Sequence, residues 1–451
     1  MMLVYFKLLI SLCIPLLLGI FGIATVLRKR LTAFSYLERL ALAFASGVWI
    51  LILIMFSLPL INLPLSFQNI AFAAGLLLIG LFPFSLRSLI HFVPKSLPKL
   101  KSFWFYLLLL AISIKVLFVF WSALLKPMID PDIIQCYALA VKHTFLNQIP
   151  IYPASKPPLP FLIESWPLIS IDAWQDNLLP FFYPFLYISF LIIFYSGLKR
   201  HFSELYSLFF TFLLASLPLL LFHAGTAYTD FPQAFYYSAA TIYLFQFVKE
   251  FNSSRDKAHS FFLASMLFLG IAVWVKRSAL LYYSGINLSV LALFLVYHWK
   301  NIQKGEWRNL AFGFLLFTII ILPWIIYHNF VSFSQYYGQA IPALKQTISH
   351  PRLAMAQVIL LAMLRNMFSE GNWQLLWMFF FSLLVLFPRK SFTLPNSVLL
   401  IILAVNLSAL FAIFLFTNLF ISIFNDTILN RLMLHFVPVV LYFCAETCST
   451  K

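Results

Sequence analysis

The sequence predicts an all-α polytopic membrane protein, and composition and run length are the observations that predict it. Of its 451 residues, 63% are hydrophobic and only 10% are charged, and the mean hydropathy is +0.94. Soluble chains average about 45–50% apolar and about 25% charged residues, so a soluble protein could not hide this much apolar surface from water. Apolar runs of about 20 residues recur from end to end, and each matches the roughly 30 Å core of a bilayer. Such unbroken runs disfavour a β-barrel, whose strands alternate polar and apolar residues.

About thirteen segments are long and apolar enough to span a membrane as helices. The first follows Met1 directly, has only Lys7 as a basic flank and lacks a small-residue cleavage pattern. We therefore expect it to be a retained helix and not a signal peptide. The predicted spans are 3–26, 41–61, 69–86, 102–124, 178–197, 206–223, 230–248, 259–275, 279–298, 310–328, 371–387, 397–424 and 432–448.

The basic residues are distributed unevenly between the two sets of loops that join these spans. Loops after odd-numbered spans hold 18 Lys and Arg, and loops after even-numbered spans hold 9. Because short cytoplasmic loops are enriched in Lys and Arg, this asymmetry predicts an outside N-terminus and an inside C-terminus. The net charge of +16 is then explained by loops at the cytoplasmic face, and we expect no nucleic-acid partner.

This orientation places the two long polar segments, 125–177 and 329–370, outside the membrane. The first contains the proline-rich stretch IYPASKPPLP at 151–160, which is unsuited to a spanning helix. Its flanks, 132–146 and 159–170, are candidates for helices that lie at the membrane interface, as is 355–368 in the second segment. The four cysteines are too few and too scattered for a disulfide scaffold or a metal motif.

Charged residues that gather at the predicted outer face are the candidates for function. Asp130 and Asp132 open the first long outer segment, and Asp230 lies in a very short loop two helices later. Lys276 and Arg277 form a basic pair in another short outer loop. Each has a simpler explanation, because an aspartate can cap a helix and long basic side chains can extend to the lipid headgroups. Charge at the edge of the hydrocarbon is nevertheless costly, and it usually has a partner or a function.

Carboxylates and cations on one face suit the chemistry of a lipid-linked phosphate. Cations at the interface bind the phosphate head group. A carboxylate can take the proton of an acceptor hydroxyl, and carboxylates also stabilise the cation-like state of a sugar that leaves a phosphate.

Four stretches in order resemble the GT-C glycosyltransferases, most closely bacterial members related to the aminoarabinose and protein O-mannose transferases. Asp132, Tyr137 and Ala140, followed by PPLPFL at 157–162, are similar to the first external loop of that family. The other three stretches are AYTDFPQAFY at 227–236, WVKR at 274–277 and NRLMLHFVP at 430–438. The resemblance covers 102–448, so residues 1–101 would be additional N-terminal helices preceding a GT-C-like catalytic module.

The resemblance implies an inverting transferase that takes sugar from a polyprenyl-phosphate donor at the extracytoplasmic face of a bacterial inner membrane. It implies Asp132 as the base and Asp230 as a second acid. The family often has adjacent Asp and Glu where this chain has Asp130-Pro-Asp132, so either aspartate could be the base. The candidate substrate-binding residues are Lys276, Arg277, Arg431, Tyr137, Tyr228, Lys156 and His223.

The acceptor could be a glycan, a lipid or a protein, and membrane lipids are expected neighbours. No cofactor is certain, although Asp130, Asp132, Asp230 and His223 include ligand types that a divalent cation accepts. Two other functions stay open. One is a transporter or lipid flippase, for which no internal repeat is evident. The other is an O-antigen ligase or polymerase, for which the segment 329–370 supplies His350, Arg352 and Arg365.

Overall fold

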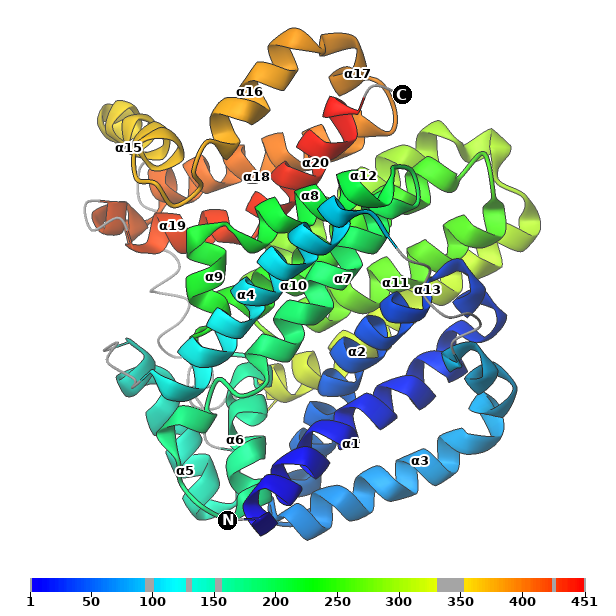
Figure 1. Ribbon diagram of the computed structural model, residues 1–451, viewed down its shortest axis with the longest axis vertical. Coiled ribbons are helices and arrows are strands. Elements are labelled where there is room, and N and C mark those ends of the chain that lie inside the picture. Colours follow the sequence, from blue (N-terminus) through cyan, green and yellow to red (C-terminus); the bar gives the residue numbers. More distant parts are fainter. Residues whose placement is uncertain are drawn as a thin grey trace.

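The computed structural model describes residues 2–93, 101–126, 132–150, 156–330, 353–423 and 427–449. Over these ranges the chain is built from helices and contains no strand, which confirms the predicted fold class (Figure 1). The α-helices are α1 (Met2–Leu27), α2 (Tyr36–Ser57), α3 (Phe67–Leu89), α4 (Phe103–Leu125), α5 (Leu139–Asn147), α6 (Leu159–Ile171), α7 (Tyr183–Lys199), α8 (Glu204–Ala215), α9 (Pro218–Ala224), α10 (Asp230–Glu250), α11 (Arg255–Val273), α12 (Ser284–Tyr297), α13 (Lys304–Phe330), α15 (Ala356–Phe368), α16 (Leu376–Leu386), α17 (Pro388–Phe392), α18 (Asn396–Phe416), α19 (Thr427–Leu434) and α20 (Val437–Cys448).

The chain is an integral membrane protein. Its described residues include 9 helices long and apolar enough to cross a bilayer, or up to 11 if each of two bent helix pairs counts as one span. Two further predicted spans, 230–248 and 371–387, are helical but differ from this pattern. The first, α10, is long but rich in polar side chains, and the second contains the short apolar helix α16. The two segments predicted to lie outside contain α5, α6 and α15. Every residue of α6 is buried, so the prediction of an interfacial helix at 159–170 is wrong: protein, and not the membrane surface, covers this helix.

Helix α10 is the buried centre of the bundle, and its position explains its polar composition. Every residue from Asp230 to Val248 is buried. Its neighbours include α7, α11, α12, α18, α19 and α20, which surround it with protein (Figure 1). Polar side chains on such a helix meet other polar groups of the protein, so they avoid the cost of contact with lipid.

Two helices break near the functional region, and proline causes both breaks. Pro218 lies in the first turn of α9, and the pair α8 and α9 is bent by 72° at the break between them. Pro438 lies in the first turn of α20, and the pair α19 and α20 is bent by 45°. A proline has no N–H to donate, and its ring collides with the carbonyl four residues earlier. These breaks turn α9 and α19 away from the axes of α8 and α20.

The three N-terminal helices pack against the rest of the bundle. Helices α1 and α2 approach closely at Gly19 and Gly47, where a Cβ atom would overlap backbone carbonyls of the facing helix. Helix α2 also contacts α7 and α11, and the hydroxyl of Tyr236 on α10 donates to the carbonyl of Ala45 at 2.9 Å. Helix α2 therefore supports α10 directly.

Candidate active site

Asp230 opens α10, at the end of the helix that meets α19 and the connection between α11 and α12. Thr229 holds the N-cap position, and the Asp230 side chain forms no capping bond, so the capping alternative does not describe this residue. The carboxylate is fully buried, with 0% exposure. A buried charge is stable only when paired, so the groups around it decide its state.

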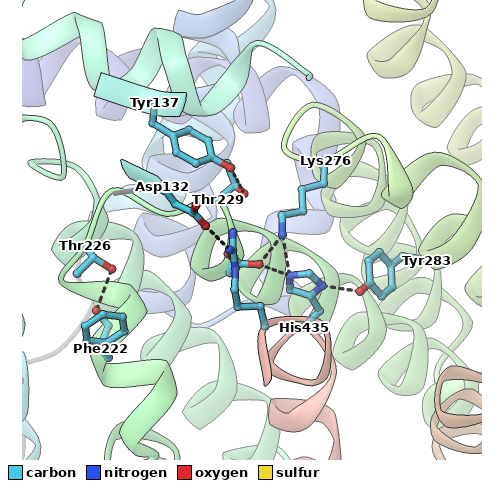
Figure 2. Close-up of polar contacts among 10 residues, drawn as sticks. Asp132, Tyr137, Phe222, Thr226, Thr229, Lys276, Tyr283 and His435 are labelled. Atoms are coloured by element: carbon cyan, nitrogen blue, oxygen red, sulfur yellow. Dashed lines mark hydrogen bonds and ion pairs between the residues drawn. The ribbon is translucent and has the colours of Figure 1, made fainter. Parts of the chain in front are cut away.

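Three basic side chains from two distant segments converge on this carboxylate, and Figure 2 shows two of them, Lys276 and His435, with their nitrogen atoms facing one another. Lys276 Nζ pairs with Oδ1, and Arg431 Nε lies 2.8 Å from Oδ2. The Nε2 atom of His435 lies 3.2 Å from Oδ1. Lys276 comes from the turn after α11, whereas Arg431 and His435 come from α19 and the break that follows it.

Arg431 joins Asp230 to the second candidate acid, Asp132. Its Nη1 atom lies 3.0 Å from Oδ2 of Asp132 while Nε contacts Asp230, so one guanidinium spans both carboxylates. The planar, multi-donor guanidinium suits this arrangement better than an ammonium group would. Asp132 is 61% exposed, whereas Asp230 is buried. The pair thus has one solvent-facing carboxylate and one enclosed carboxylate, held close together as expected from the sequence.

His435 belongs to the cluster around Asp230, although it was not among the site residues predicted from the sequence. Its Nδ1 atom forms a hydrogen bond with the hydroxyl of Tyr283, and its Nε2 atom lies 3.4 Å from Lys276 Nζ. The side chain is fully buried at the break between α19 and α20. The signal was its place four residues after Arg431 within NRLMLHFVP, because that spacing puts both side chains on one helix face.

Aromatic side chains form a wall beside the charged cluster. Tyr137 shares a hydrogen bond of 3.3 Å with Thr229, and Lys156 Nζ lies 4.4 Å from the centre of the Tyr137 ring. Tyr228 stacks against Arg431, with 4.7 Å between the guanidinium carbon and the ring centre, and contacts His223 at 5.0 Å between rings. Burial raises the pKa of Tyr137 to about 12, so its hydroxyl stays protonated and can donate.

The structure separates the predicted basic pair. Lys276 turns inward to Asp230 and is 21% exposed. Arg277 is exposed, and its guanidinium forms no hydrogen bond or ion pair with other described residues. The cluster therefore contains Asp132, Asp230, Lys276, Arg431 and His435, with the aromatic wall beside it. Asp130 lies outside the described residues.

Over the ranges described, no three His, Cys, Asp or Glu side chains gather closely enough to hold a metal ion. Both oxygens of Asp230 already accept from basic side chains.

Comparison with known proteins supports the fold. The sequence matches no family model and no curated protein. The structure resembles a crystal structure of ArnT from Cupriavidus metallidurans in the apo state, with a TM-score of 0.54 and 15% sequence identity. This chain therefore shares its fold with ArnT over the matched region. The match covers 77% of this chain and 60% of the ArnT chain, so the shared fold spans less than two thirds of that protein's length.

Proposed function

We propose that the protein is an inverting glycosyltransferase that moves a sugar from a polyprenyl-phosphate donor to an acceptor at the extracytoplasmic face of its membrane. The observation that supports this most directly is the cluster of Asp132, Asp230, Lys276 and Arg431 at the start of α10. Its two carboxylates and two cations are the groups that such a transfer requires. The bundle around it resembles that of ArnT. We propose that, in a bacterial cell, the reaction takes place at the periplasmic side of the inner membrane.

The donor phosphate is assigned to Lys276 and Arg431. Both side chains keep some contact with the exterior, at 21% and 23% exposure, while Asp230 beneath them is fully buried. Asp230 would then hold the two cations in place and not react itself. A phosphate oxygen can compete for Nη1 of Arg431, the atom that contacts Asp132.

Asp132 is assigned as the general base, and donor binding would release it from Arg431 for that role. A phosphate that takes over Nη1 releases the Asp132 carboxylate toward the acceptor hydroxyl. The acceptor oxygen then forms a bond to the anomeric carbon while the bond from that carbon to the phosphate oxygen breaks. Asp132 receives the hydroxyl proton, and polyprenyl phosphate leaves with its new negative charge held by Lys276 and Arg431. Attack opposite the leaving group inverts the anomeric centre.

Sugar transfer by the purified protein in detergent tests this proposal. The donors are polyprenyl phosphates that carry different sugars, and transfer to added glycan, lipid or peptide acceptors is followed by mass spectrometry. Asp132→Asn should lower the rate of the chemical step by roughly 100-fold or more, since general base catalysis contributes about 10²–10⁴-fold. Donor binding should survive in this variant. If the parent consumes no polyprenyl-phosphate sugar, or if Asp132→Asn keeps the parent rate, the proposal is wrong.

A further inference from the structure

Gln233 is the one polar side chain of α10 that lacks a hydrogen-bond partner in the described structure. It is fully buried, and both Oε1 and Nε2 are unpaired. The other polar side chains of this helix each have a partner. They are Asp230, Tyr236, Tyr237, Ser238, Thr241, Tyr243, Gln246, Lys249 and Glu250.

We expect the unpaired amide of Gln233 to have a hydrogen-bond partner when the protein is at work. Burying an amide without hydrogen bonds is unfavourable, and buried polar groups in folded proteins are almost always satisfied. Gln246, further along the same helix, shows the ordinary outcome. Its Nε2 donates to the hydroxyl of Tyr442 at 2.7 Å, and its Oε1 lies 2.9 Å from Nε2 of His201.

Gln233 lies next to the charged cluster. It follows Asp230 by three residues, so it sits about 4.5 Å deeper along the helix and about 60° around it. On the helical wheel its direction falls between those of Tyr236 and Tyr237. Tyr236 packs against Phe268 of α11, and Tyr237 packs against Tyr283 just before α12. Gln233 therefore faces the connection between α11 and α12, which carries Lys276.

We propose that Gln233 binds a hydroxyl group of the transferred sugar and so contributes to the choice of donor; this inference rests on the proposed function. Lys276 and Arg431 would hold the phosphate at the rim of the site, and the attached sugar would then reach toward the first turns of α10. An amide has two donor hydrogens and an acceptor oxygen, so it matches a hydroxyl group that both donates and accepts. A neutral amide also suits an uncharged sugar better than a phosphate.

The test compares the affinity for two lipids in the purified, detergent-solubilised full chain. One lipid is polyprenyl phosphate without sugar. The other is the polyprenyl-phosphate sugar that the parent binds best in a panel of hexoses and amino sugars. Gln233→Leu should weaken binding of the sugar-bearing lipid roughly 2- to 13-fold, the range for one neutral hydrogen bond. Binding of bare polyprenyl phosphate should not change. Gln233→Met, which keeps a long unbranched side chain, replaces the leucine variant if that protein does not fold.

Gln246→Leu is the matched control, because it removes a buried, fully bonded glutamine from the same helix. It should lower the thermal stability and leave the ratio of the two lipid affinities at the parent value. Gln233→Leu should change the ratio without lowering the thermal stability. If the ratio is unchanged in a folded Gln233 variant, water or the protein satisfies this amide, and the inference fails while the proposed function stands. If the parent binds neither lipid, the proposed function fails first.

Discussion

The guanidinium of Arg431 lies 2.8 Å from the carboxylate of Asp230, although 201 positions of sequence separate the two residues. Asp230 is fully buried, so its charge is stable only because Arg431 and Lys276 neutralise it. The contact ties the first turn of α10 to α19. The ion pairs therefore have a role in folding as well as the proposed role in catalysis.

Asp230→Asn should destabilise the protein because it leaves Lys276 and Arg431 without their shared counter-charge. Removing one partner of a buried ion pair costs about 3–5 kcal/mol, and we expect the lower part of that range because both cations reach solvent. Denaturation in detergent measures the effect. Asp176→Asn, at an exposed aspartate, should change stability little. Equal losses in the two variants would contradict the assignment of a buried ion pair.

Lys276 and Arg277 should differ in their effect on donor use, although they are neighbours. Lys276→Gln removes a cation from the cluster and should raise the donor concentration needed for half-maximal rate roughly 10- to 150-fold. Arg277→Gln removes an exposed cation with no described partner, so it should leave the donor requirement near the parent value. Steady-state kinetics over a donor series distinguishes the two. A larger effect at Arg277 would assign the phosphate to that residue instead.

Glu164 should make the stability fall as the pH rises. Burial within α6 raises the pKa of its carboxyl well above the usual range, and its Oε1 accepts a bond of 2.7 Å from Tyr183. The folded state therefore keeps a proton that the unfolded state releases, so stability declines above the unfolded pKa of about 4.3, by up to about 1.4 kcal/mol per pH unit. Glu164→Gln preserves the acceptor and should flatten this decline in melting temperature between pH 5 and pH 8. Parallel curves for parent and variant would rule out a protonated Glu164.

Gly47→Ala should destabilise the packing of α1 on α2. A Cβ at this position would overlap the carbonyl of Pro15, and overpacking costs about 1–3 kcal/mol. Gly75→Ala in α3 is the matched control, since no heavy atom lies within 4 Å of its added Cβ. Alanine favours helix over glycine by up to about 1 kcal/mol, so this control should be neutral or stabilising. Thermal unfolding of both variants checks the contrast, and a neutral Gly47→Ala would show that the helices can separate at no cost.

The predicted orientation has a direct test in a cysteine-free background. Ile149→Cys, in the first long outer segment, should react with a membrane-impermeant maleimide added to intact spheroplasts. Lys304→Cys, in a loop predicted to be cytoplasmic, should react only after the membrane is opened. The reverse pattern would invert the topology and move the cluster to the cytoplasmic side.

The sequence predicts the helices well because apolar run length is a local property. It predicts less about α10, since the polar residues of this helix became explicable only when neighbouring helices were seen to enclose it. The breaks at Pro218 and Pro438 carried a local signal, but the apolar runs on either side made 206–223 and 432–448 look like single spans.

The site shows where sequence information ends. Asp132, Asp230, Lys276 and Arg431 could be selected because charge is rare in this chain and each lies in a family-like motif. The sequence could not show that Lys276 turns inward while Arg277 faces outward, because neighbouring residues of a turn point in different directions. It also gave no warning that Arg431 joins both carboxylates, since that contact depends on how distant helices pack.

The two cations that neutralise Asp230 are synthesised after it, and far apart in time, because of their positions in the sequence. The ribosome makes Lys276 46 residues after Asp230 and Arg431 201 residues after it. While the chain is still being made, Asp230 has at most the lysine for a partner, and α10 is too polar to be stable in lipid alone. Helix α10 must therefore stay in contact with the helices made before it, or inside the insertion machinery, until α19 and α20 have been synthesised. A chain truncated before α19 would contain most of the bundle and would leave the buried carboxylate of Asp230 with one of its two cations.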